Sequence, residues 1–390
     1  MSDSVSQSWP FTSSAGATRL QPVNDRRGLR DFLRVPFRIY RDDPCWVPPL
    51  DFERRGALAP KNPFFAHAEW QGWVAYDGAE PVGRITAQLD RLHEERHGER
   101  AGYFGMIEAP DDDAVFAALL AAAEEWLRGR RAVKAVGPFN LGINQELGIL
   151  VDGFDTPPYF MMPHSPPYYG AALKTQGYEG VQDLLAYVMD PAFDDTPLMR
   201  ALLRHLAPRA SVRPLARKHL DAELEVLRDI FNDAWSENWG FVPFTREEFN
   251  TIGREMLILI PDDFIWIAEV DGEPAAFIVL LPNVNEAIAD LHGRLLPFGW
   301  AKLLWRLKVR YPRTGRVPLM GVRRRYHHTR LGPGLAYQVI DAVRGPAVRE
   351  GLRQVELSWI LDDNRGMRNI IEDIGGRVSK RYRMYEKPLA

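Results

Sequence analysis

The sequence predicts two α/β domains in tandem, each built on a mixed β-sheet, with the N-terminal copy a degenerate version of the C-terminal one. The length of 390 residues suits two domains of about 100–200 residues each. The C-terminal half alternates strands and helices in the order β-α-β-β-β-α-β-α-β, and the N-terminal half repeats this order less clearly. Both halves contain two apolar runs joined by Asp-Gly, at residues 77–78 and 271–272, which is a strong hairpin signal.

The C-terminal elements follow from periodicity and turn residues. Leu220, Leu224, Leu227 and Phe231 have helical spacing after a short strand that begins at Val212. Later segments are separated by Gly, Asn and Asp, which end helices and form turns. The remaining expected elements are a hairpin at 263–282, a strand at 317–322, a helix at 332–351, a strand at 354–361, a helix at 364–376 and a strand at 377–387.

The N-terminal half gives a comparable series. We expect a helix at 27–41, a hairpin at 70–90, a strand at 102–109, a helix at 111–131, a strand at 132–139, a helix at 166–178 and a strand at 183–190. The expected domains are therefore a flexible tail at 1–18, a degenerate domain at 19–195 and a second domain at 205–390, with an insertion at 283–316. The Asp- and Pro-rich stretch at 190–197 is the expected linker.

Composition excludes several classes of protein. One cysteine, Cys45, cannot form an internal disulfide, and the chain has neither a signal-peptide pattern nor a run of about 18 apolar residues. We therefore expect a cytoplasmic protein, with peripheral attachment to the inner membrane as an alternative. The net charge of −3 argues against nucleic-acid binding. Between Asp290 and Asp341, however, eleven Lys and Arg occur without an acid, which predicts one strongly cationic surface.

That basic region contains the segment "GVRRRYHHTRLGPGLAYQVIDAV" at 321–343, between the expected fourth strand and its helix. With the strand order, it resembles the GCN5-related N-acetyltransferase (GNAT) superfamily over about residues 212–387. Members of that superfamily hold the pyrophosphate of coenzyme A on backbone N–H groups at the start of this helix. Their pattern is Gln or Arg, two residues, Gly, one residue, Gly or Ala. One register puts His327, Arg330 and Gly332 at these positions, and the other puts Thr329, Gly332 and Gly334 there.

The resemblance implies acyl-CoA as a co-substrate, with no permanently bound cofactor and no metal. Acids replace the basic turn in the N-terminal copy, at Asp111, Asp112 and Asp113, and acids repel a polyanion. Only the C-terminal copy is therefore expected to bind CoA. Asn364 stands where family members often carry an Asn that fixes the cofactor. The expected CoA contacts are Val322, Arg323, Arg324, Arg330, Gly332, Gly334, Leu335 and Asn364.

The catalytic base has several candidates. Glu356 in the fifth strand, Asp362 at its end and His327 beside the phosphate turn could each take a proton from an amine. The tyrosine that often protonates the departing CoA thiolate is replaced by Ile371. A thiol with a pKa near 8.5 can leave without a dedicated acid, so this replacement does not exclude acyl transfer.

The insertion at 283–316 suggests a lipid-like substrate. Apolar residues including Phe298, Trp300 and Trp305 alternate there with Lys and Arg, as in helices that lie on anionic membranes or cover a hydrophobic channel. This segment and "GPFNLGINQELGILVDGFDTPPYFMMPHSPPYY" resemble a group of long bacterial GNAT-like proteins that includes the bacterial ceramide synthases. The resemblance implies an N-acyltransferase that moves a fatty acyl group from acyl-CoA to a hydrophobic amine, such as a sphingoid base. The alternatives are an acetyltransferase for small amines and a non-catalytic lipid- or ligand-binding module.

Overall fold

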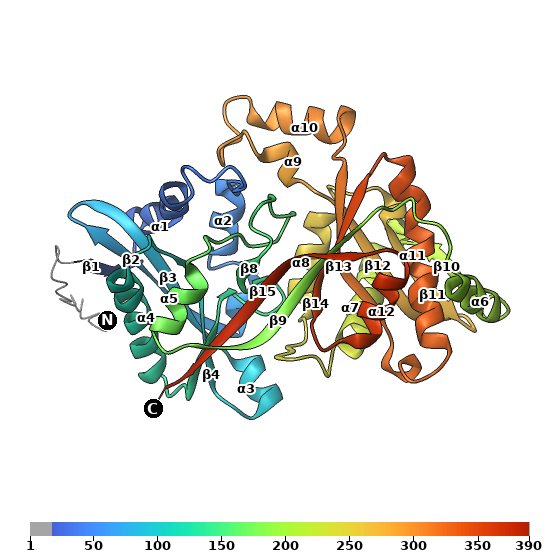
Figure 1. Cartoon of the computed structure of the whole chain (residues 1–390), viewed down its shortest axis with the longest axis horizontal. Helices are drawn as coiled ribbons and strands as arrows, with labels where there is room; N and C mark the ends of the chain where they lie inside the picture. The colour runs from blue at the N-terminus through green and yellow to red at the C-terminus, as the bar shows by residue number, and fades with distance from the viewer. Residues whose placement is uncertain (1–17, 390) are drawn as a thin grey trace. The chain divides into compact units, whose positions relative to one another are not determined.

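A computed structural model describes residues 18–389 of the chain, which form two compact units (Figure 1). Within the described residues, unit 1 contains 18–157, 161–182 and 382–389. Unit 2 contains Pro158–Phe160 and Asp183–Arg381. Two long strands, β9 (Glu179–Met189) and β15 (Arg377–Pro388), supply residues to both units.

Unit 1 is a mixed sheet in the order β1-β2-β3-β4-β5-β15. Neighbouring strands are antiparallel except β4 and β5, which are parallel. The strands are β1 (Arg19–Pro22), β2 (Ala68–Asp77), β3 (Glu80–Asp90), β4 (Ala101–Glu108) and β5 (Lys134–Gly137). The helices are α1 (Arg26–Ile39), α2 (Asp51–Ala57), α3 (Arg91–His97), α4 (Asp113–Arg128) and α5 (Tyr169–Thr175). Short strands β6 (Phe139–Asn140), β7 (Glu146–Leu147) and β8 (Ile149–Asp152) follow β5.

Helices cover both faces of this sheet, and the residues of β2 show why. Side chains alternate between the faces of a strand. Trp73 and Ala75 accordingly join a core that contains Phe116 of α4, whereas Val74 and Tyr76 join a second core that contains Phe32 of α1. A strand buried on both faces is apolar almost throughout, as β2 is between Trp73 and Tyr76.

Unit 2 is a sheet in the order β9-β14-β13-β12-β11-β10, with only β13 and β14 parallel. Its strands are β10 (Ala210–Pro214), β11 (Ile265–Val270), β12 (Glu273–Pro282), β13 (Thr314–Val322) and β14 (Gln354–Leu361). Its helices are α6 (Pro197–Leu206), α7 (Leu220–Ala234), α8 (Arg246–Met256), α9 (Asn285–Ile288), α10 (Gly299–Val309), α11 (Leu331–Arg349) and α12 (Arg365–Asp373). Helices α7 and α11 pack on the sheet, and α6 packs on α11.

The expected strand and helix order is found in both halves, but the division of the chain differs from the expected boundaries. Unit 2 begins at Asp183 inside β9, and the last residues, from Tyr382, belong to unit 1. The expected tail at 1–18 lies outside the described residues except for residue 18. The expected linker ends in α6, where the Thr196 side chain caps the helix and Pro197 occupies its first turn. No helix in the described part of the chain is long and apolar enough to cross a membrane.

Candidate active site

The central feature of unit 2 is the separation of its two parallel strands. Strands β13 and β14 are paired from Thr314 opposite Gln354 to Val317 opposite Leu357, and the recorded pairing ends there although both strands continue. On their other sides β13 stays paired with β12 as far as Val322, and β14 pairs with β9 as far as Leu361. Diverging strands leave backbone N–H and C=O groups facing each other without a ladder, so a ligand that carries amides can bond to them.

Apolar side chains become partly exposed where the strands diverge. Residues 315–317 of β13 and 355–358 of β14 are buried. The residues that follow on the two strands are half-buried: Pro318, Leu319, Met320, Trp359, Ile360 and Leu361. Half-buried apolar side chains on two facing strand segments suit an apolar ligand rather than water.

A buried polar cluster lies at the start of this divergence. Glu356 of β14 is fully buried, and Arg316, opposite it on β13, is 1% exposed. The Ser358 hydroxyl donates to Glu356 Oε1 at 2.7 Å, and Arg316 Nε donates to the Ser358 oxygen at 2.8 Å. Arg316 Nε also lies 3.8 Å from Glu356 Oε1. Glu356 Oε2 is buried and has no hydrogen-bond partner among the described residues, so one carboxylate oxygen keeps its capacity to accept a hydrogen bond.

Burial sets the acidity of this carboxyl group. Removal from water disfavours the charged form and raises the pKa of Glu356 from 4.5 to about 7. The positive charge of Arg316, the Ser358 hydrogen bond and the positive charge of Lys380 oppose this rise. Lys380 of β15 is itself 1% exposed. A carboxyl group with a pKa near 7 is suited to accept and release a proton near neutral pH.

Residues 158–160, from the N-terminal half of the sequence, belong to unit 2 and lie beside this cluster. The Phe160 N–H donates to Asn283 Oδ1 at 3.0 Å, and Arg316 donates to the Phe160 carbonyl at 3.0 Å. The Tyr159 hydroxyl donates to Gln354 Oε1 at 2.7 Å. Burial, followed by the charge of Glu356, raises the pKa of Tyr159. Tyr159 is therefore a neutral hydrogen-bonding group beside the carboxylate.

The arginines of the predicted phosphate turn are less available than the sequence suggests. Arg323 forms an ion pair with Asp229 at 2.6 Å, and Arg324 pairs with Glu237. The prediction of one strongly cationic surface between residues 290 and 341 is therefore wrong. Acids of α7 and of the turn after it neutralise two of the arginines, and Arg316 is buried. Arg325 and Arg330 are exposed and form no ion pair with any described residue.

The turn glycines serve packing at this helix start. A Cβ on Gly332 would lie 2.5 Å from the Tyr326 carbonyl oxygen, and Gly334 faces Leu206 of α6. The Gly332 N–H already donates to the Thr329 carbonyl at 3.3 Å, and the Leu331 N–H donates to the Thr329 hydroxyl at 3.2 Å. These N–H groups are occupied within the turn, so the structure supplies a packing reason for Gly332 that the sequence pattern does not reveal, whereas a Cβ on Gly334 would meet Leu206 only at an ordinary contact distance of 3.6 Å.

The other expected CoA contacts lie in different surroundings. Leu335 is fully buried in α11, and Val322 is 9% exposed at the end of β13. Asn364 is the N-cap of α12, where its Oδ1 accepts from the Met367 N–H at 3.1 Å. Ile371, at the position of the family tyrosine, is fully buried and offers no acid.

The three candidate bases are not brought together. His327 follows the end of β13 and uses Nε2 in a 2.6 Å hydrogen bond with the Val322 carbonyl. Asp362 follows the end of β14, six residues beyond Glu356, which is about 20 Å along a strand. Of these candidates, Glu356 lies in the buried cluster. The sequence did not predict its neighbours Arg316, Ser358, Lys380 and Tyr159. For Arg316 and Glu356 the sequence does carry one indication of a functional role, which is a charged residue inside an apolar strand.

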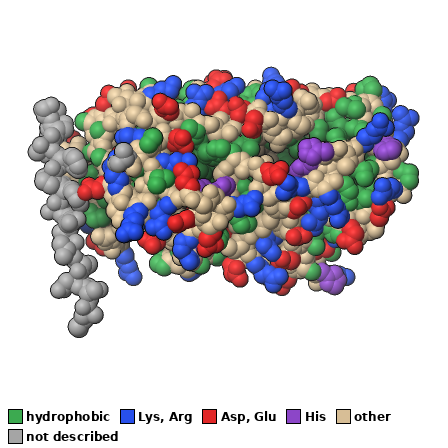
Figure 2. All heavy atoms as spheres, turned by 90° about the horizontal axis from the view of Figure 1, so that it is seen from below, with side chains coloured by type: hydrophobic (Ala, Val, Ile, Leu, Met, Phe, Trp, Pro, Cys, Tyr) green, Lys and Arg blue, Asp and Glu red, His purple; other side chains and the backbone are tan. Residues whose placement is uncertain are grey.

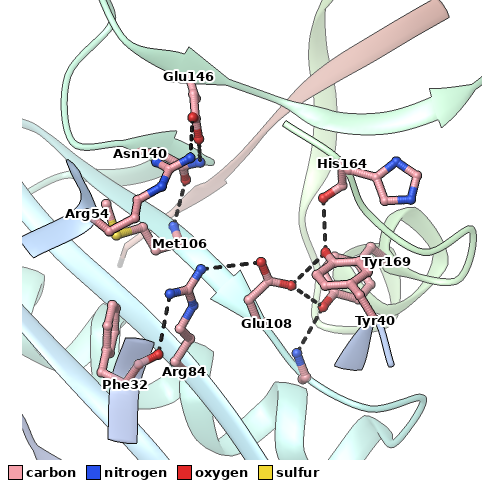
Figure 3. Close-up of polar contacts among 11 residues, drawn as sticks. Phe32, Tyr40, Arg54, Arg84, Met106, Glu108, Asn140, Glu146, His164 and Tyr169 are labelled. Carbon is pink, nitrogen blue, oxygen red and sulfur yellow. Dashed lines mark hydrogen bonds and ion pairs between the residues drawn. The ribbon is translucent and has the colours of Figure 1, made fainter. Parts of the chain in front are cut away.

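The corresponding place in unit 1 is filled by the chain itself (Figure 3). Strands β4 and β5 pair only from Ala101 to Tyr103. Beyond this point, the Met106 N–H donates to Asn140 Oδ1 at 2.8 Å. A Cβ on Gly105 would lie 1.7 Å from the Phe139 carbonyl oxygen. The segment that contains β6 therefore contacts the part of β4 that would otherwise face a ligand.

Unit 1 also carries a buried polar network at the end of β4. Glu108 Oε2 accepts from the Tyr40 hydroxyl at 2.7 Å and from the Tyr169 hydroxyl at 2.8 Å, and Arg84 lies 3.4 Å from Oε1 (Figure 3). Burial raises the pKa of Glu108, although the charge of Arg84 and these hydrogen bonds lower it. Both carboxylate oxygens have partners, as a structural role requires.

Charged side chains of both signs are exposed on the molecular surface (Figure 2). On the face drawn in Figure 2, basic and acidic side chains are interspersed over the surface of each unit.

Comparison with solved structures identifies the fold. A tandem GNAT protein from the clavulanic acid biosynthesis pathway superposes with a TM-score of 0.55 and 14% identity, covering 95% of this chain and 99% of that protein. The GCN5-related glucosamine N-acetyltransferase region of a fungal GH3 β-N-acetylglucosaminidase gives a TM-score of 0.58 at 13% identity, covering 99% of this chain and 39% of that one. The expected tandem GNAT fold is confirmed, and the chain is of the class of proteins with this fold.

Comparison with known sequences identifies the family. No family model matches the chain. Protein YghO of Escherichia coli (strain K12) is 51% identical over 368 residues, which are 94% of each chain. The bacterial ceramide synthase of Caulobacter vibrioides (strain NA1000 / CB15N) is 46% identical over 383 residues, which are 97% of this chain and 100% of that protein. The chain belongs to the family of these two proteins, as the sequence resemblance implied.

Proposed function

We propose that this protein is an acyl-CoA-dependent N-acyltransferase that transfers a fatty acyl group to the amine of a hydrophobic acceptor of the sphingoid-base type. The observation that carries the proposal is the buried Glu356 at the divergence of β13 and β14, with one carboxylate oxygen free. The bacterial ceramide synthase that shares 46% of its residues supports the choice of acceptor.

The divergent strands suit the CoA arm. The pantetheine arm of CoA carries two amides, and the backbone groups of β13 and β14 beyond Val317 and Leu357 offer complementary donors and acceptors. At the far end of β13, Arg325 and Arg330 are the exposed cations that lie closest in sequence to the start of α11. They are the side chains best placed to meet phosphate groups.

The reaction needs one proton acceptor. Glu356 takes a proton from the acceptor ammonium group, and the freed amine nitrogen attacks the thioester carbonyl to form the C–N bond. The tetrahedral intermediate collapses, the C–S bond breaks, and the sulfur leaves with its electron pair as CoA thiolate. The second proton of the attacking nitrogen is lost to solvent or to the thiolate, which gives the amide and free CoA. Arg316 and Lys380 keep Glu356 able to ionise despite its burial.

The apolar side chains beyond the divergence suit a long acyl chain. Leu319, Met320, Trp359 and Ile360 are half-buried on the two strands that would face the thioester. Each additional buried CH₂ of an acyl chain contributes about 0.8 kcal/mol of binding. A preference for long-chain over acetyl donors is therefore expected.

The test is a matrix of donors and acceptors. Purified protein is incubated with acyl-CoAs of increasing length and with long-chain and small amines, and free thiol and amide product are measured. The proposal expects release of thiol with long-chain donors and acceptors, reduced at least about 100-fold by Glu356→Gln. Activity confined to acetyl-CoA and small amines would favour the acetyltransferase alternative. Binding of CoA without thiol release for any pair would favour the non-catalytic module.

A further inference from the structure

Helix α10 of the insertion presents its apolar side to solvent. Trp300 is 51% exposed, Leu304 52%, Trp305 50% and Val309 65%. Positions 300 and 304, and positions 305 and 309, are four residues apart, so each pair lies on one line along the helix, and the two pairs together form a broad apolar stripe that covers about half of the helix circumference. Leu296 and Phe298, just before the helix, are 80% and 78% exposed. Figure 1 shows α10 at the periphery of unit 2, beside α9.

The opposite side of α10 is polar and holds the helix on its own unit. Asp290, after α9, forms ion pairs with Lys302 and with Arg306, the latter at 2.9 Å. Arg306 also donates to the Ala287 carbonyl at 2.7 Å. These bonds use charges on the side that faces α9, next to half-buried Leu303 and Leu307. The helix therefore packs on its unit through these ion pairs and two leucines, and it leaves its larger apolar side chains exposed, unlike the usual surface helix.

Such a stripe needs an apolar partner. Exposed apolar patches of this kind, rimmed by polar residues, mark contact sites for membranes or other proteins. Free cations flank the helix in the sequence: Arg294 before it, and Arg310 and Arg313 after it, are exposed and form no ion pair with any described residue. The acids of the insertion are engaged, since Asp290 binds Lys302 and Arg306, and Glu286 accepts from the Arg313 and Thr314 N–H groups.

We propose that α10 and the preceding residues 296–298 dock unit 2 onto the surface of an anionic membrane. The aromatic and aliphatic side chains enter the headgroup region, and the three arginines contact the lipid phosphates. This inference rests on the proposed function, since both proposed substrates are amphiphiles that partition into lipid. A bilayer is favoured over a second copy because the stripe combines two tryptophans with three free arginines on the flanking segments, which would repel their counterparts in an identical copy.

The test measures binding without catalysis. The full chain is sedimented with vesicles of phosphatidylcholine alone and of phosphatidylcholine with one-third phosphatidylglycerol, at low and high salt. Binding to the anionic vesicles is expected and should weaken with salt. Trp300→Ala and Trp305→Ala should each reduce it about tenfold, since each removes a large half-exposed ring. Ile258→Ala is the matched control, because Ile258 is 83% exposed in the same unit but outside the insertion.

Two results would overturn the docking proposal. One is equal vesicle binding by the wild-type protein and the two tryptophan variants. The other is a dimer in sedimentation velocity that Trp300→Ala dissociates, since the stripe would then bind a second copy. Acyl transfer between detergent-dispersed substrates is measured in parallel. Its presence without vesicle binding rejects the docking while the proposed function stands, and vesicle binding without transfer supports the docking and rejects the function.

Discussion

Arg316 and Glu356 are direct partners on the two parallel strands of unit 2, and both side chains are almost completely buried. Arg316 Nε lies 3.8 Å from Glu356 Oε1, and the Ser358 hydroxyl links the two groups. The guanidinium does not bind the carboxylate in a bidentate pair, so Glu356 Oε2 is left free. A buried acid held by a nearby cation but not fully satisfied can exchange a proton with a substrate.

Replacing Arg316 should change the pH dependence of acyl transfer. The charge of Arg316 lowers the pKa of Glu356, so Arg316→Gln should raise that pKa above about 7. A rise of one unit reduces the ionised fraction and the rate near pH 7 about fivefold, with recovery at about pH 9. The pH profile of kcat/KM measures this shift, with Arg200→Gln, at an exposed position of α6, as a surface control. Because an unpaired buried acid costs about 3–5 kcal/mol, Arg316→Lys is the milder companion. An unshifted profile in folded Arg316→Gln would contradict a base at Glu356.

Glu356 should make stability depend on pH in a definite direction. Its pKa is raised from 4.5 to about 7 in the folded protein, so the folded state favours the protonated form. The resulting stability is present in full below about pH 4.5 and is lost as the pH rises through about 7. Relative to Glu356→Gln, the wild-type protein should therefore lose about 3 kcal/mol of unfolding free energy over this range. Urea denaturation of both proteins at each pH measures the difference, and parallel curves would argue against the raised pKa.

The phosphate turn should respond unequally to charge reversal. Arg330 is exposed and unpaired, whereas Arg324 is engaged by Glu237. Arg330→Glu should weaken CoA binding by about 1–3 kcal/mol, and Arg324→Glu should have a smaller effect. Isothermal titration with CoA gives both constants and should saturate at one CoA per chain. Equal affinity of wild type and Arg330→Glu would remove Arg330 from the binding site.

The carbonyl oxygen and the amide nitrogen of the Asn364 side chain can be tested separately by substitution. Its Oδ1 caps α12 through the Met367 N–H, and its amide nitrogen is the proposed contact with the cofactor. Asn364→Ser keeps a cap acceptor and removes the amide, whereas Asn364→Ala removes both and should cost about 1 kcal/mol of stability. Reduced turnover in both variants, with the stability loss confined to Asn364→Ala, is expected from thermal melts and steady-state kinetics. Full turnover in Asn364→Ser would leave this residue a helix cap only.

Substitution of Gly105 tests whether the segment that contains β6 packs against β4 in unit 1. A Cβ there would lie 1.7 Å from the Phe139 carbonyl oxygen, so Gly105→Ala must displace backbone. We expect a loss of more than about 3 kcal/mol in chemical denaturation, as for other severe overpacking. In Gly56→Ala the new Cβ meets no atom within 4 Å, and this α2 variant should gain up to about 1 kcal/mol. Similar stabilities for the two variants would show that the β6 segment does not pack against β4 as described.

Much of the fold could be predicted because its signals are local. Apolar strand runs joined by Asp-Gly gave both hairpins, and Asp271 and Gly272 do have positive φ angles in the structure. The start of α6 carried an equally local signal, since Thr196 and Pro197 are a typical cap and first residue of a helix. The surrounding Asp and Pro residues suggested a linker instead.

The site was less predictable because its decisive contacts join distant residues. Glu356 was a candidate from its place in a strand, but its burial depends on the pairing with β13. Arg323 was predicted to bind phosphate because its ion-pair partner could not be recognised in the sequence. That partner, Asp229, lies 94 positions away. The spacing of α10 indicated an amphipathic helix, but only the bonds of Lys302 and Arg306 to Asp290 show which side faces solvent.

The shared strands mean that the two halves of the sequence are not separable modules. A fragment that starts after residue 195 would lack residues 183–189 of β9, the antiparallel partner of β14, and Pro158–Phe160, which bind Asn283 and Arg316. It would expose the unpaired edge of β14, the strand that carries Glu356, and exposed edges promote aggregation. Recombination that exchanges unit 1 between relatives would therefore have to exchange its three sequence segments, residues 18–157, 161–182 and 382–389, together. This requirement restrains how the family can evolve.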